Sequence, residues 1–167
     1  MSKPSKLLSL GELSAKLTEL RKGGNKIVLA NGCFDLIHVG HIRYLREAKQ
    51  KGDVLVVAIN SDSSVRQNKG EVRPILNQME RAEIVSAFEF VDFVIIFNES
   101  TVASLLRSLK PDIHCKGTDY TPHTVPEREV VKQYGGEICI VGDPKNHSSR
   151  DFIKNILRKF SSNEPIF

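Results

Sequence analysis

The sequence predicts a single α/β domain built on a doubly wound sheet of five parallel strands. Short apolar runs alternate with segments of helical periodicity along most of the chain. One of these runs, DVLVVAIN at residues 53–60, is almost continuously apolar, as a strand buried on both faces must be. Such an alternation of strands and helices is typical of a parallel sheet with helices on both faces.

Each apolar run can be assigned to a strand or a helix from its length, its periodicity and the residues that end it. Glycine pairs and Pro111 supply several of the end signals. We expect strands at residues 26–32, 53–60, 90–97, 112–117 and 137–142. We expect helices at residues 7–22, 41–52, 80–89, 101–110, 125–136 and 149–160, and a polar, basic connection at 61–76.

Two of the expected helices carry specific local signals. The first has Leu10, Leu13, Leu17 and Leu20 at spacings of three and four residues, which would place them on one apolar face. Ahead of the third helix, Asn77 is followed three residues later by Glu80, the spacing of a reciprocal helix cap.

The chain has 167 residues, of which 40% are hydrophobic, and this suits one domain with one core. We expect an N-terminal helical segment at 1–24, the α/β domain at 25–160 and a C-terminal tail at 161–167. The net charge of +4 is modest and no block of like charge occurs, so nucleic acid is not an expected partner.

Cysteine usage and hydropathy indicate a compartment for the protein. Cys33, Cys115 and Cys139 form no CxxC pair, which argues against a disulfide framework or a zinc site. The first residues contain no apolar run of signal-peptide length, and no run reaches the roughly 18 residues of a membrane helix. We therefore expect a cytoplasmic protein that has no membrane partner.

An unusual polar cluster, NGCFDLIHVGH at residues 31–41, follows the first expected strand. His38 and His41 lie three residues apart at the start of a helix, so both can face one ligand. A helix start presents free N–H groups, and Gly40 lets an anion approach the backbone closely. Two imidazoles there can donate hydrogen bonds to phosphate oxygens. A metal pair is the alternative, but no third ligand has suitable spacing.

Three further polar clusters lie where ligands bind to such sheets, beyond the carboxyl ends of the strands. The first, at residues 69–74, follows the second strand and supplies mobile cations of the kind that phosphoryl-type transfer requires. The second, at residues 147–151, opens the last helix, where capping and phosphate binding use the same N–H groups. The third, at residues 116–120, follows the fourth strand. The residues that we single out in these clusters are Lys69, Arg73, Ser148, Ser149, Arg150, Lys116, Asp119 and Tyr120.

The string GCFDLIHVGH at residues 32–41 resembles the signature of the cytidylyltransferase-like nucleotidyltransferases, which have a Rossmann-like sheet of the nucleotidyltransferase type. The resemblance implies that His38, His41 and Lys69 contact the triphosphate and stabilise the transition state. It assigns other residues to nucleotide binding, namely Gly32, Cys33, Phe34, Gly40, Arg73, Ser148, Ser149 and Arg150. Arg150 departs from the family pattern, which has a hydroxyl residue there. The candidates for the second substrate are Asp35, Lys116, Asp119 and Tyr120, and no protein-bound metal is expected.

Longer strings resemble the adenylyltransferase half of enzymes that act on D-glycero-β-D-manno-heptose 1-phosphate. Among them are VAINSDSSVRQNKGEVRPI and KPDIHCKGTDY. Glu89 occupies a position where glycerol-phosphate cytidylyltransferases usually carry arginine, and KGTDY is close to the KGGDY of the heptose enzymes. The resemblance implies transfer of AMP from ATP, with Mg²⁺ bound through the phosphates, to give ADP-heptose and pyrophosphate for lipopolysaccharide or surface-polysaccharide synthesis. It also implies a homodimer and a separate kinase that supplies the sugar 1-phosphate.

Two other functions stay open at this point. The first is a CTP-dependent transferase acting on glycerol phosphate or a similar alcohol phosphate. The second is a nucleotide-binding module without catalysis, an alternative that Arg150 keeps open.

Overall fold

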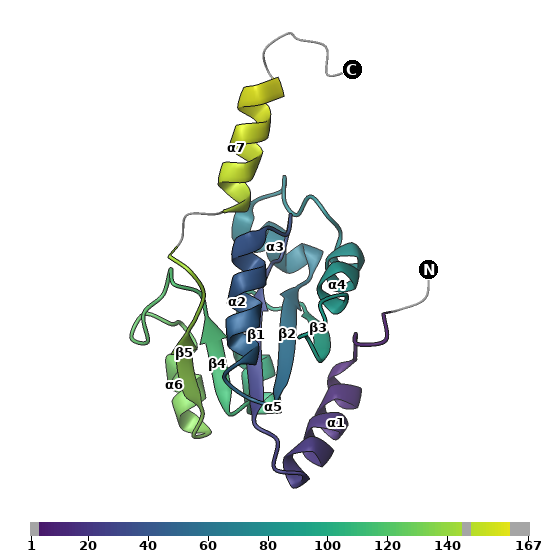
Figure 1. The fold of residues 1–167 in the computed structure, drawn as a ribbon, viewed down its shortest axis with the longest axis vertical. Coiled ribbons are helices and arrows are strands. Elements are labelled where there is room, and N and C mark those ends of the chain that lie inside the picture. The colour runs from purple at the N-terminus through teal and green to yellow at the C-terminus, as the bar shows by residue number, and fades with distance from the viewer. Residues whose placement is uncertain (1–3, 145–147, 161–167) are drawn as a thin grey trace.

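The computed structural model describes residues 4–144 and 148–160 (Figure 1). Five parallel strands form one sheet in the order β3-β2-β1-β4-β5. The chain fills one side of β1, crosses over it and then fills the other side. The predicted fold class is therefore confirmed, and the strand order reverses between β1 and β4, where such sheets bind their ligands. The strands are β1 (Ile27–Gly32), β2 (Val54–Asn60), β3 (Phe93–Phe97), β4 (Ile113–Lys116) and β5 (Glu137–Ile140).

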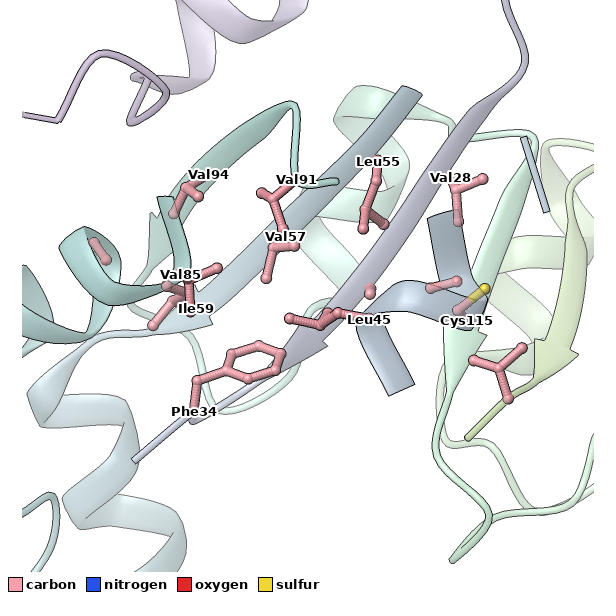
Figure 2. Close-up of a cluster of buried hydrophobic side chains, with 14 of the residues drawn as sticks. Val28, Phe34, Leu45, Leu55, Val57, Ile59, Val85, Val91, Val94 and Cys115 are labelled. Atoms are coloured by element: carbon pink, nitrogen blue, oxygen red, sulfur yellow. The ribbon is translucent and has the colours of Figure 1, made fainter. Parts of the chain in front are cut away.

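Helices cover both faces of the sheet, and each face has its own apolar cluster. On one face, α2 and α4 pack over strand residues such as Val57, with Leu45 and Phe34 in the same cluster (Figure 2). On the other face, α1, α5 and α6 pack over residues such as Val56. Every residue of β2 is buried, as expected for a strand covered on both sides. The helices are α1 (Leu10–Lys22), α2 (Val39–Lys49), α3 (Asp62–Lys69), α4 (Gln78–Ser86), α5 (Ala103–Leu109), α6 (Arg128–Gln133) and α7 (Ser149–Phe160).

The first helix is shorter than the sequence predicted, and it packs into the apolar cluster that it shares with α5 and α6. It begins at Leu10 because Ser9 and Glu12 form a capping box there. Leu7 instead pairs with Val94 of β3 in an isolated bridge. Leu13 and Leu17 are fully buried in the cluster beneath α5, whereas Leu10 is 43% exposed, so its expected place on the apolar face was wrong. The expected tail at 161–167 lies outside the described residues.

The largest departure from the prediction is α3, which occupies part of the expected 61–76 connection. This helix is almost entirely polar, and Val65 is its one fully buried apolar side chain, so it carries no apolar periodicity. The Ser61 hydroxyl accepts a hydrogen bond from the Ser64 N–H, and Asp62 pairs with Arg81 of α4. Contacts with distant residues therefore stabilise a helix that local apolar pattern does not predict.

Two other predictions about helix ends had different outcomes. The capping box of Asn77 and Glu80 is confirmed at the start of α4. Gly52, expected to stop α2, lies three residues beyond its last residue, Lys49. A Cβ atom at Gly52 would come within 2.8 Å of the Lys26 carbonyl oxygen. Close packing against the start of β1 therefore requires glycine there.

The Arg81 side chain is fully buried and connects three segments of the chain. Its guanidinium donates hydrogen bonds to the Leu76 carbonyl oxygen at 3.0 Å and to the Cys33 carbonyl oxygen at 2.5 Å. It also pairs with Asp62 Oδ1 at 2.7 Å. The loop after β1, the start of α3 and the start of α4 are thus held by one cation.

In the part of the chain that the structure describes, no helix combines the length and the hydrophobicity that crossing a membrane requires.

Replacing Arg81 with methionine should lower the free energy of unfolding by about 3–5 kcal/mol, because two carbonyl groups and one carboxylate lose their partner. Urea denaturation followed by circular dichroism measures the change. Arg107→Met, which removes an exposed arginine from α5, is the matched control. Equal midpoints for the two variants would contradict the structural role given to Arg81.

Candidate functional site

An open cleft of about 1270 Å³ lies at the carboxyl ends of β1 and β4, where the strand order reverses. It brings together all four polar clusters that the sequence singled out. Of the site residues expected from the sequence, those that line the cleft are Gly32, Cys33, Phe34, His38, Gly40, His41, Lys69, Arg73, Lys116, Asp119, Tyr120, Ser148, Ser149 and Arg150. Their individual roles stay predictions. His147, part of the cluster that opens the last helix, lies outside the described residues.

The two histidines of the HVGH turn lie beside each other at the start of α2, with their rings tilted by 37°. His38 is the N-cap residue in extended backbone, and the ring centroids of His38 and His41 are 3.9 Å apart. The His38 backbone N–H donates to His41 Nδ1 at 3.3 Å. This hydrogen bond leaves the proton of the neutral His41 ring on Nε2. His41 can therefore donate a hydrogen bond from Nε2.

His41 is neutral at physiological pH. Burial lowers its pKa to about 3, and the nearby positive charges of His38 and Lys69 contribute in the same direction. An imidazole in this state is a hydrogen-bond donor and not a cation. A bound polyphosphate would raise the pKa again, because its negative charge favours the protonated ring.

The backbone ahead of the two histidines adopts an uncommon conformation. Phe34 and Leu36 both have φ of 50°, a region that residues other than glycine rarely occupy. The Phe34 ring lies so close to Gly32 that a Cβ atom there would be 3.2 Å from it, and it packs against His41 with centroids 5.6 Å apart. Such conformations persist only where surrounding contacts impose them, and they gather at functional sites.

Asp35 is not among the residues that line the cleft, and its contact with the second substrate stays a prediction. Its side chain is 1% exposed, and its Oδ2 atom pairs with Arg73 at 2.6 Å. The same carboxylate accepts hydrogen bonds from the N–H groups of Ile75 and Leu76. Burial opposes ionisation, but these N–H groups and the Arg73 guanidinium outweigh it and lower the pKa of Asp35 below its usual 3.8. Asp35 therefore orients Arg73 and the loop after α3.

The start of α7 is anchored to the loop after β1, which contains Asp35. The Ser149 hydroxyl donates to the carbonyl oxygen of Asp35 at 2.7 Å. Ser148 Oγ accepts from the Asp151 N–H at 3.1 Å, as a helix cap does. Beyond this anchor, α7 projects away from the rest of the fold (Figure 1). The residues that open α7 and the histidines of the HVGH turn thus border one cleft.

A polar network at the end of β4 includes three residues that we did not assign to the site from the sequence, Asn31, His114 and Glu127. Asn31 Oδ1 lies 3.1 Å from His114 Nε2 and 3.4 Å from Lys116 Nζ. Lys116 Nζ also lies 3.9 Å from Glu127 Oε2 and 4.6 Å from the centroid of the Tyr120 ring. Burial lowers the pKa of Lys116, while the carboxylates of Glu127 and Asp119 oppose this shift.

The sequence contained a signal for only part of this network. A histidine in the middle of a four-residue buried strand, IHCK, is polar where apolar residues are expected, and it could have been singled out. Glu127 gave no signal, because a glutamate at the start of a helix is common. Among residues 4–144 and 148–160, no group of three or more His, Cys, Asp or Glu side chains is placed to hold a metal ion.

Comparison with known proteins places the chain in a family and identifies similar sequences. Residues 29–162 match the family model described as cytidylyltransferase-like. The chain is 45% identical over 156 residues to the bifunctional protein HldE of Geobacter metallireducens, and this alignment covers 93% of the chain and 32% of that protein. It is 46% identical over 152 residues to the bifunctional protein HldE of Desulfatibacillum aliphaticivorans, covering 91% of the chain and 31% of that protein. The chain thus spans about a third of the length of these relatives.

A solved structure has the same fold. The crystal structure of the lipopolysaccharide core biosynthesis protein from Thermoplasma volcanium superimposes with a TM-score of 0.63 at 33% sequence identity. The superposition covers 73% of this chain and all of the other.

The buried imidazole of His114 should make the protein sensitive to acid. Burial, with the charge of Lys116, lowers its pKa to about 3, whereas the unfolded chain titrates near 6.5. Between these values the unfolded state binds the extra proton, so stability falls as pH decreases from 6.5 towards 3. His114→Gln removes this titration. We expect the wild-type loss to exceed that of the variant by up to about 1.4 kcal/mol per pH unit.

Urea denaturation of both proteins between pH 7 and 4.5 measures this difference. The other titrating groups are common to the two proteins, so they cancel in the comparison. Parallel curves of stability against pH would show that His114 is not buried in its neutral form.

Proposed function

The chain belongs to the cytidylyltransferase-like family of nucleotidyltransferases, and we propose that it transfers AMP from ATP to D-glycero-β-D-manno-heptose 1-phosphate. The products would be ADP-heptose and pyrophosphate. One observation carries the proposal: the HVGH turn, the start of α7 and the Lys69 segment border a single cleft. A triphosphate placed there would meet hydrogen-bond donors from all three.

The proposed reaction needs no covalent intermediate. A sugar 1-phosphate is already anionic at neutral pH, so one of its oxygens can attack the α-phosphorus of ATP in line without a general base. Catalysis of this kind depends on positioning and on stabilising charge. His41 would donate from Nε2 to a phosphate oxygen, while His38, Lys69 and the N–H groups of α7 hold the rest of the triphosphate. ATP would enter as its Mg²⁺ complex, and the metal would help pyrophosphate leave.

Two kinds of observation support heptose 1-phosphate as the acceptor: the similarity to named proteins and the position of charged and aromatic residues at the cleft. The relatives named above are bifunctional HldE proteins, and the structural neighbour is a lipopolysaccharide core biosynthesis protein. Within this chain, Lys116 and Tyr120 border the cleft at the end of β4, across the switch point from Lys69 of α3. An ammonium group there suits the phosphate of an acceptor. A kinase acting on a heptose would have to supply that substrate.

A screen of nucleotides against acceptors tests the proposal. ATP, CTP, GTP and UTP are each incubated with heptose 1-phosphate and with glycerol 3-phosphate, and pyrophosphate release is measured. We expect release with ATP and heptose 1-phosphate at a rate at least about 100-fold above every other pair, since a missed set of polar contacts costs that much. Preference for CTP with glycerol phosphate would replace this proposal with a cytidylyltransferase, and ATP binding without release would indicate a non-catalytic module.

Removing the His41 imidazole should reduce turnover by about two to three orders of magnitude, because a hydrogen-bond donor to the reacting phosphates would be lost. Single-turnover rates and the free energy of unfolding are measured for His41→Ala. His123→Ala, which changes an exposed histidine outside the cleft lining, is the control. We expect the fold to persist in both variants. A turnover rate near that of the wild type in His41→Ala would refute the assigned role.

A further inference from the structure

Glu127 is buried next to the cleft, yet one of its carboxylate oxygens has no hydrogen-bond partner among residues 4–144 and 148–160. The residue is 5% exposed and borders the cleft just before α6. Its Oε2 atom is buried and accepts no hydrogen bond from any of the described residues. A buried carboxylate oxygen in this state is costly, because it has lost water without gaining a donor. A ligand that brings a donor would remove that cost.

The cation that pairs with Glu127, Lys116, does not donate a hydrogen bond to it. Lys116 Nζ lies 3.9 Å from Oε2, which is an ion-pair distance but too long for a hydrogen bond. The same ammonium donates a long hydrogen bond to Asn31 Oδ1 at 3.4 Å and lies 4.6 Å from the centroid of the Tyr120 ring. An ammonium and a carboxylate thus lie side by side on the cleft wall, and each has hydrogen-bonding capacity to spare.

This pair is complementary to a phosphate that carries a hydroxyl on the adjacent carbon. The ammonium suits the phosphate, and the carboxylate, which can only accept, suits the hydroxyl. Resting on the function proposed above, we infer that Glu127 accepts a hydrogen bond from the hydroxyl next to the phosphorylated carbon of the acceptor sugar. Glu127 is then a specificity-determining residue that selects sugar phosphates over acceptors that lack this hydroxyl.

A simpler role for Glu127 would be to neutralise Lys116, and the two roles predict different results. If Glu127 only orients Lys116, its removal weakens every phosphorylated acceptor equally. If it binds the hydroxyl, its removal weakens the acceptor that carries this hydroxyl and leaves the deoxy analogue nearly unchanged. The informative quantity is therefore the ratio of kcat/KM for the two acceptors.

The experiment compares heptose 1-phosphate with its 2-deoxy analogue in the wild type and in Glu127→Gln. We expect the wild type to favour the hydroxylated acceptor by about 10- to 100-fold, as a hydrogen bond to a charged group allows. In Glu127→Gln this ratio should fall below about 5-fold, while the KM for ATP changes less than about 2-fold. Glu129→Gln is the matched control, because Glu129 is an exposed neighbour that pairs with Arg128. It should retain the wild-type ratio.

An unchanged ratio in Glu127→Gln would overturn the inference, whatever the overall rate. If that variant does not fold, Glu127→Asp keeps the charge but shortens the side chain, and the same fall in the ratio is expected. If the wild type uses a different sugar phosphate, the proposed function fails, and the ratio is measured with that sugar and its own deoxy analogue. The two ideas can therefore fail separately.

Discussion

The Arg81 guanidinium is the contact on which the candidate site depends most. It is fully buried, and it donates to the Cys33 and Leu76 carbonyl oxygens while pairing with Asp62. These partners belong to the loop after β1, the loop before α4 and the first turn of α3. The planar fork of arginine can bind several acceptors in fixed directions, which lysine cannot do. The polar α3 and the HVGH turn therefore keep a constant relative position.

Asp35 provides a second, complementary connection. Arg81 donates to carbonyl groups, whereas Asp35 accepts from the N–H groups of Ile75 and Leu76 and from Arg73. The Ser149 hydroxyl in turn donates to the Asp35 backbone, so α7 depends on the same loop. These contacts sustain the uncommon backbone on either side of Asp35. Donors for a polyphosphate are thereby oriented before any ligand arrives, which is the condition for electrostatic catalysis.

The two ends of the cleft differ in how their polar groups are paired. Around the HVGH turn, His41 is neutral and held by a backbone hydrogen bond. At the end of β4, Lys116 Nζ and Glu127 Oε2 are 3.9 Å apart, too far for a hydrogen bond, and Lys116 donates a long hydrogen bond of 3.4 Å to Asn31. The first arrangement suits rigid binding of the nucleotide, which is the same substrate in every catalytic cycle. The second leaves polar groups for an acceptor to satisfy, and it is there that specificity can be built.

The sequence by itself determined the strands, most helices and the residues of the HVGH cluster, because apolar periodicity and a dense local motif are properties of neighbouring residues. It also predicted which polar clusters would follow strands, and the sheet brings them to one edge.

Only the tertiary structure decided the positions of α3, Asp35 and Glu127. The helix α3 has no apolar face of its own and is held by Arg81, which is 19 residues away from Asp62 in the chain. Asp35 lies within the motif but contacts the loop after α3. The lack of a hydrogen-bond partner at Glu127 Oε2 among the described residues results from packing between segments. Contacts of this kind join residues that are distant in the chain, and they leave no local pattern from which they could be predicted.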